Sequence, residues 1–184
     1  MKQQIRQLRL GSLLLNESNN KEVISDQVLF GWVRDRIRKR WEAMWARSES
    51  GSWTKSLIKQ VGKKLVFPRD RNTGISYVRA LLNNAAVADN MLRMNLSETS
   101  ECECGEDRET VEHVLLKCRK EVDIRNELMK QIENIWMGKK TEGGLQFDLN
   151  VILYPFANDN LSDIESREIM QHVFSFIRRM SRNL

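Results

Sequence analysis

Residues 102–118 read Cys102-Glu-Cys104-Gly-Glu-Asp-Arg-Glu-Thr-Val-Glu-His113-Val-Leu-Leu-Lys-Cys118 and hold all three cysteines and one of the two histidines of the chain. Three thiolates and one imidazole complete a tetrahedral Zn²⁺ shell with no cysteine left over. We therefore predict one structural zinc ion held by Cys102, Cys104, His113 and Cys118. The alternative is three buried free thiols beside an incidental histidine, since cysteine is a good core residue.

The spacing within this window suits a small closed metal site. Gly105 follows the Cys-x-Cys pair, where a tight turn often needs a positive φ. The run from Glu109 indicates one or two helical turns. His113 and Cys118 lie five residues apart, within the range of zinc-finger ligands. Four protein ligands leave no open position for water, so we expect no zinc hydrolase chemistry.

The remaining composition predicts an all-α fold with a small CCHC zinc-binding insert and at most one short strand. The chain has 184 residues, only two prolines, and many good helix formers. We expect residues 1–21 to form a flexible or partly helical arm, and residues 22–184 to form a single helical domain with the zinc knuckle at 102–118. The apolar run at residues 10–15 is too short for a membrane span, and reduced cysteines favour an intracellular location, nucleus or cytoplasm.

Helical periodicity indicates where the elements lie. Ser25 is expected to cap a long helix to about residue 48, with an apolar stripe that makes Trp41 and Trp45 core residues. Further helices are expected at 53–61, 75–95, 119–137 and, behind the capping-box pattern Ser162-Asp-Ile-Glu165, to the C-terminal end. Residues 147–153 are expected to form a short strand or a buried extended run. Ile75 and Leu82 are expected on the buried face of the 75–95 helix.

Charge is distributed unevenly along the chain. Residues 1–72 carry 16 Lys and Arg against 7 Asp and Glu, whereas residues 73–184 carry 14 against 18. This asymmetry favours an anionic partner near the N-terminal half, although a solvated basic surface would look the same. RNA or another single-stranded nucleic acid is the partner we favour. The candidate nucleic-acid-binding residues are Arg36, Arg38, Lys39, Arg40, Lys55, Lys59, Lys63 and Lys64.

Two strings of residues bear on the origin of the chain: Trp41-x3-Trp45-x2-Ser48-x2-Gly51-x-Trp53-Thr54-x2-Leu57-Ile58, and Cys102-x-Cys104-Gly followed by Glu109-Thr110-x-Glu112-His113-x-Leu115-Leu116-x-Cys118. Together they resemble the C-terminal CCHC zinc-knuckle region of non-LTR (LINE-type) retrotransposon reverse transcriptase polyproteins. The resemblance covers roughly residues 25–180. It implies a non-catalytic zinc module that engages nucleic acid, with the four ligands matched by position.

The sequence departs from such polyproteins in ways that limit its function. It has no Tyr-x-Asp-Asp-like polymerase motif, no RNase H acidic set, and no endonuclease Pro-Asp motif. Arg119-Lys120 stands where a proline is frequent. The chain is thus a piece of a polyprotein or a domesticated host derivative. In the second case a protein-protein adaptor or oligomerisation role is the alternative, with the first and last helices presenting apolar faces to a partner or a second copy.

We expect no enzymatic activity from this chain. A cysteine nucleophile would need a reactive thiolate outside the metal shell. His172 is a lone histidine near Glu168 on a predicted helix, and the pair has no companion motif.

Overall fold

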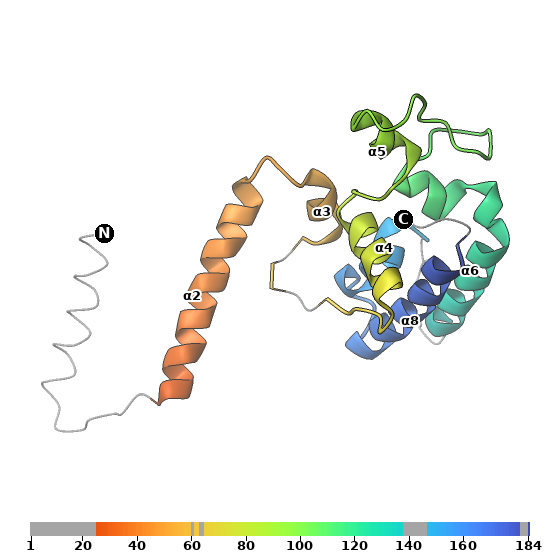
Figure 1. Ribbon diagram of the computed structural model, residues 1–184. Helices are drawn as coiled ribbons and strands as arrows, with labels where there is room; N and C mark the ends of the chain where they lie inside the picture. Colours follow the sequence, from red (N-terminus) through yellow and green to blue (C-terminus); the bar gives the residue numbers. More distant parts are fainter. Residues whose placement is uncertain (1–24, 60, 63–64, 138–146, 181–183) are drawn as a thin grey trace, which may run out of the picture. The chain divides into compact units, whose positions relative to one another are not determined.

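The computed structural model describes residues 25–59, 61–62, 65–137, 147–180 and 184, and over these ranges the chain is mostly helical (Figure 1). Its internal contacts divide it into two units, residues 1–46 and 47–184, which are described separately. The only β-pairing within the described ranges is an isolated antiparallel bridge between Glu101 and Arg108. The all-α prediction is therefore confirmed. The expected domain limits at residues 21 and 22 stay a prediction, and the arm lies outside the described residues.

Helix α2, Asp26–Arg47, accounts for the described part of the first unit. Ser25 begins it as predicted: its backbone carbonyl accepts from Val28 N at 2.9 Å, and its hydroxyl lies 3.4 Å from the same nitrogen. The helix buries none of its residues and shows little segregation of apolar from charged side chains. The expectation that Trp41 and Trp45 are core residues is wrong, because Trp41 is 53% exposed and Trp45 is half-buried.

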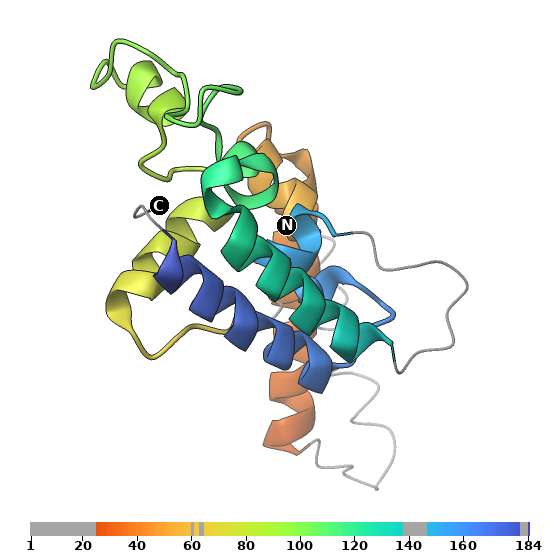
Figure 2. The same cartoon turned by 90° about the vertical axis from the view of Figure 1, so that its right-hand side faces the viewer.

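The second unit is built on three helices: α4 (Arg71–Leu81), α6 (Val122–Trp136) and α8 (Asp163–Arg179). Helix α8 packs against both α4 and α6, and Figure 2 shows α6 and α8 side by side. The face of α8 that carries Ile169, Val173 and Ile177 is buried. The predicted apolar stripe of the last helix is confirmed, and its burial within the second unit means that it is not the exposed apolar face that the adaptor alternative expected.

The helix expected over residues 75–95 is two helices. Helix α4 begins earlier because the Asp70 side chain caps it, accepting from Thr73 N at 2.8 Å. The chain breaks at Asn83, whose φ of +52° ends the helix, and α5 follows at Ala88–Arg93. The predicted face is wrong in part: Val78 packs against the core, but Ile75 and Leu82 are 39% and 53% exposed, and Tyr77 lies in the core instead.

Residues 147–153 do not form a strand. Asp148 caps a short helix, α7 (Leu149–Leu153), by accepting from Val151 N at 3.0 Å. The 3-10 turn η3 (Pro155–Ala157) follows it. A short apolar run suits a buried strand or a buried helix equally, and here the capping aspartate decides for helix. The expected burial is confirmed for residues 151–153, whereas residues 147–150 are half-buried.

The helix expected over residues 53–61 is present but ends at Leu57, four residues before its expected limit. Helix α3 covers Ser52–Leu57, and the predicted capping box opens α8, with Ser162 and Glu165 each accepting from the other's backbone N–H. Between α5 and α6 stand the π-helical turn η1 (His113–Lys117) and the 3-10 turn η2 (Arg119–Glu121). Across the described ranges we find no helix with the combination of length and hydrophobicity that spanning a bilayer requires.

Candidate metal centre

The four predicted ligands converge on one point, and we call them the Cys/His cluster: Cys102, Cys104, His113 and Cys118. Their ligand atoms all lie within 4.8 Å of one another. Each residue is at most 3% exposed. The cysteines pack as a small group of their own, separate from the main hydrophobic core.

A tight turn positions the first two ligands. Gly105 has φ of +77°, and its N–H donates to the Cys102 carbonyl at 2.8 Å, which folds the Cys-x-Cys pair back on itself. The Cys102 N–H donates in turn to the Asp107 carbonyl at 2.9 Å. The Glu101–Arg108 bridge closes the base of this loop. The positive φ expected at Gly105 is confirmed.

The π-helical turn η1 positions the other two ligands. The His113 N–H donates to the Thr110 hydroxyl at 3.0 Å, which fixes the start of the turn. The Cys118 N–H donates to the His113 carbonyl at 2.7 Å, the i to i+5 bond of a π-turn. This bond brings two residues that are five positions apart to the same side of the chain. A regular α-helix would place them about 140° apart around its axis.

The separations between donor atoms fit a tetrahedral metal ion. Bond lengths of about 2.3 Å to sulfur and 2.0–2.1 Å to nitrogen imply roughly 3.8 Å between sulfurs and 3.6 Å between sulfur and nitrogen. The Cys102 and Cys118 sulfurs are 3.8 Å apart, and Cys104 Sγ lies 3.3 Å from His113 Nε2. Three thiols and an imidazole are the donor set of a structural metal site, and a divalent ion fits among them.

The protonation of the cluster follows from its burial. Burial raises the pKa of Cys102 to about 11. At Cys104 burial also acts to raise the pKa, but the Glu106 backbone N–H and the neighbouring thiols outweigh it, and the pKa falls below the ordinary value. A metal ion must therefore displace at least the Cys102 proton on binding. The His113 Nδ1 atom is buried and has no hydrogen-bond partner within the described residues.

The outer surface of the cluster is acidic but locally neutralised. Lys117 pairs with Glu112 at 2.8 Å and Lys120 with Glu103 at 2.6 Å, and Arg108 pairs with Asp89. These exposed pairs contribute little stability individually. Their acidic members make this face a poor match for phosphate.

The predicted nucleic-acid-binding residues fall into three groups. Four lie exposed on α2: Arg36, Arg38, Lys39 and Arg40. On and just after α3, Lys59 is exposed, whereas Lys55 is half-buried and donates to the Ser48 carbonyl. Lys63 and Lys64 lie outside the described residues. The structure thus presents five of the eight as exposed cations, four of them on one helix.

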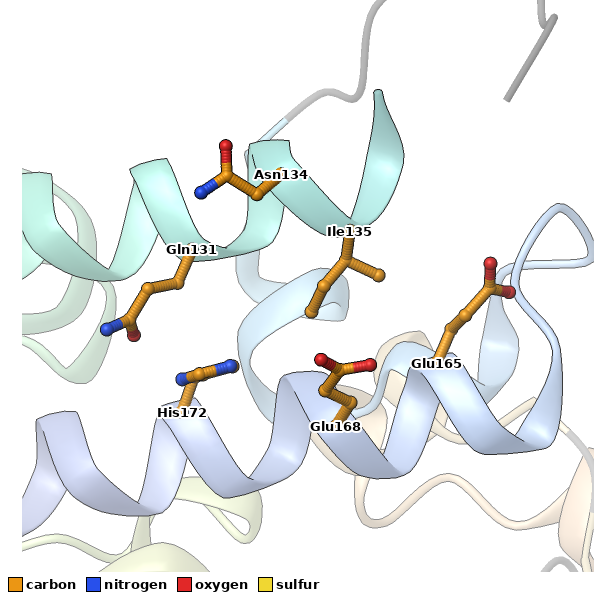
Figure 3. A pocket seen from close by; sticks show the side chains of 6 residues that line it. All are labelled: Gln131, Asn134, Ile135, Glu165, Glu168 and His172. Atoms are coloured by element: carbon orange, nitrogen blue, oxygen red, sulfur yellow. The ribbon is translucent and has the colours of Figure 1, made fainter. Parts of the chain in front are cut away.

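An open groove of about 430 Å³ lies between α6 and α8 (Figure 3). Gln131, Asn134 and Ile135 line one side, and Glu165, Glu168 and His172 line the other. Glu165 is already engaged in the Ser162 capping box. His172 and Glu168 share the groove as expected from their spacing. Glu168 and His172 are the ionisable side chains of the lining besides the capping residue Glu165.

The burial of three charged residues in or next to the 102–118 window escapes the sequence prediction; one of them, Glu109, is 7% exposed. Arg125 is 6% exposed and Glu121 is 2% exposed. Burial lowers the pKa of Arg125, while the charges of Cys118 and Glu121 act against that change. The signal was present in the sequence: residues 121, 125, 128 and 132 follow the apolar spacing of α6, which places both charges on its buried face.

Comparison with known proteins gives one relative. Over 122 residues, 62% of this chain, the sequence is 32% identical to the retrovirus-related Pol polyprotein from type-1 retrotransposable element R1 2 of Nasonia vitripennis. The match spans 29% of the length of that protein. No family model and no solved structure matches the chain.

Proposed function

We propose that this chain is a non-catalytic nucleic-acid-binding module, with single-stranded RNA as its favoured ligand, and that one structural Zn²⁺ stabilises its fold. The observation that carries the proposal is the exposed cationic group on α2. Arg36, Lys39 and Arg40 are spaced at three and four residues, so they are neighbours on the helix surface. Cations in this arrangement neutralise successive phosphates and release counterions.

Aromatic side chains accompany these cations. Arg36 lies over the Trp32 ring, 5.5 Å from its centroid, and Trp32 is 53% exposed. Trp41 is exposed to the same degree on the same helix. Exposed aromatic rings between cations suit unpaired bases, which stack on them. Single-stranded nucleic acid is therefore favoured over a duplex, whose bases are already stacked.

The relative supports a nucleic-acid partner by its name, which is that of a retrotransposable element's Pol polyprotein. This chain would then derive from, or belong to, a protein of that kind. Zinc is the metal we propose because a Cys₃His set is typical of structural zinc. A closed set of four protein ligands, with no catalytic constellation in the described ranges, supports a non-enzymatic role.

The test is binding of a fluorescently labelled single-stranded RNA to the full chain over a salt series. Reversing charge at Arg36, Arg38 and Arg40 should weaken binding and lower the slope of log K against log salt by about 2, since each single-strand contact contributes about 0.7. The matched control reverses three exposed cations of the second unit: Arg69, Arg71 and Arg79. Far-UV circular dichroism checks folding. Equal affinity in all three proteins would reject the proposal.

A second function is favoured by the exposed apolar residues of α2, among them Phe30, Ile37 and Met44, each more than 60% exposed. These residues would suit a protein partner or self-association. Light scattering across the same salt series separates the two functions. Self-association by apolar contact should persist at high salt, whereas nucleic-acid binding should fade.

A further inference from the structure

We propose that Arg125 is the counter-charge and positioning residue of the Cys/His cluster: a buried guanidinium that anchors Cys118 from helix α6 and offsets the negative charge the cluster acquires with a divalent metal. Arg125 Nη2 donates to the Cys118 carbonyl at 2.7 Å. The Glu121 N–H donates to the same carbonyl at 3.2 Å. The backbone of one ligand is thus tied by one hydrogen bond to the end of η2 and by another to the first turn of α6.

Charge balance requires such a group. Three thiolates, a neutral imidazole and a divalent ion sum to one negative charge, and the ligands are at most 3% exposed. A buried net charge is costly unless an opposite charge lies beside it. Arg125 is itself 6% exposed and keeps its proton at any ordinary pH. It places a buried positive charge beside the loaded cluster, and the buried carboxylate of Glu121 is the competing counter-charge considered below.

The hydrogen bonding of Arg125 is incomplete. Its Nη1 atom is buried and has no partner within the described residues. A buried cation with an unmet donor is unfavourable for folding by itself. Its presence on the buried face of α6 is explained if it compensates a nearby anion. Its hydrogen bond to the Cys118 carbonyl places the guanidinium next to one ligand residue of the cluster.

Glu121 offers a competing explanation, because it is also buried and its charge acts on Arg125. If Arg125 served Glu121 alone, removing both charges together would leave the cluster unaffected. If Arg125 serves the cluster, metal affinity would stay low in the double variant. The two explanations therefore predict different results for Glu121→Gln combined with Arg125→Gln.

The experiment measures Zn²⁺ affinity of the full chain by competition with a chromogenic chelator. Arg125→Gln should lose 10- to 100-fold in affinity, the usual effect of losing a group that supports metal ligands. The matched control is Arg119→Gln, which removes the same charge next to Cys118 from a side chain that is 67% exposed. That charge is screened by solvent, so affinity should change by less than about twofold.

Further variants separate charge from packing. Arg125→Lys keeps the charge and should lose less affinity than Arg125→Gln, and the double variant should bind as weakly as Arg125→Gln. With Co²⁺ as probe, the sulfur-to-metal charge-transfer band should move to lower energy in Arg125→Gln and stay in place in Arg119→Gln. If Arg125→Gln does not fold, Arg125→Lys and the double variant decide the question between them.

Four results would overturn the proposal. They are a wild-type chain that binds no stoichiometric metal, an Arg125→Gln affinity equal to that of Arg119→Gln, equal losses in Arg125→Gln and Arg125→Lys, and recovery of wild-type affinity in the double variant. The proposal concerns the metal centre and does not rest on nucleic-acid binding, so either can fail without the other.

Discussion

The Cys/His cluster and helix α2 differ most in the burial of their side chains. Every ligand of the cluster is at most 3% exposed, whereas α2 buries none of its 22 residues. Apolar residues at helical spacing occur both in α2 and in the helices next to the cluster. In the second unit the apolar residues are buried in the core, so folding explains their presence. The apolar residues of α2 are not buried, so we look to binding for an explanation of their presence.

The comparison also separates two kinds of charge. The cations around the cluster are paired with carboxylates, as Lys117 is with Glu112. On α2 one cation, Arg38, is paired in the same way, with Asp35 at 2.9 Å, whereas Arg36 lies over an aromatic ring instead. Paired charges near a closed site stabilise their surroundings modestly, while a cationic helix surface raises the local concentration of anions. Four predictions would break or sharpen this contrast.

The largest effect is expected from removing a metal ligand. Cys104→Ser or His113→Ala should abolish metal binding and unfold the region around residues 102–118, because metal binding there is folding free energy of about 10 kcal/mol. Elemental analysis of the reduced protein and amide hydrogen exchange measure the two consequences. Helix α2 should exchange at its wild-type rate. Fully reduced wild-type protein that carries no metal would refute the prediction.

The next effect compares one residue type in the two regions. Ile132 is 1% exposed in the core, and Ile37 is 61% exposed on α2. Ile132→Ala should lower the free energy of unfolding by about 2–5 kcal/mol, the usual cost of truncating a buried isoleucine to alanine, because apolar burial is lost and a cavity is left. Ile37→Ala should change it by less than about 0.5 kcal/mol. Denaturant unfolding measures both, and a similar loss in the two variants would show that α2 is part of the core.

The sequence predicted the cluster well because its chemistry is local. Four ligands within seventeen positions can reach one ion through a turn at Gly105 and a single π-turn, and the structure brings them together. The Ser162 capping box is local for the same reason. The role of a residue can be predicted from sequence when it depends on contacts within a few positions.

Other features depended on distant contacts or on small local differences, and there the predictions failed. Asn83 ends α4 by adopting a left-handed conformation, which the apolar periodicity of the sequence does not predict. The burial of Trp41 was inferred from spacing alone, yet a stripe reports only which residues share a face. Arg125 was overlooked because charged residues are rarely buried without a partner, and its hydrogen-bond partner is a backbone carbonyl seven positions earlier, which residue types do not reveal.

A pH effect is expected in the second unit only, because both tyrosines lie there. Burial raises the pKa of Tyr77 and of Tyr154. In the unfolded chain both tyrosines ionise at about pH 10, so above that pH the unfolded state binds fewer protons than the folded state. Stability is therefore complete below pH 10 and falls as pH rises further. Ionisation would also remove the proton that Tyr77 donates to the Leu153 carbonyl at 2.9 Å.

Alkaline titration followed by tyrosinate absorbance and circular dichroism measures this effect. Tyrosinate should appear together with loss of helical signal, and denatured protein should titrate near pH 10 as the control. Titration of both tyrosines near pH 10 with the helical signal intact would contradict the burial of these residues.

The smallest effect compares two helix caps of similar geometry. The Ser25 hydroxyl accepts from Val28 N at 3.4 Å at the start of α2, and the Ser162 hydroxyl accepts from Glu165 N at 3.3 Å at the start of α8. Ser162→Ala should lower the free energy of global unfolding by about 1 kcal/mol, because α8 packs through the core and cannot fray alone. Ser25→Ala removes an equivalent bond from a helix that buries none of its residues. It should leave the global transition unchanged and speed amide exchange in the first turn of α2 alone. Equal shifts of the global transition in the two variants would mean that α2 folds and unfolds cooperatively with the second unit.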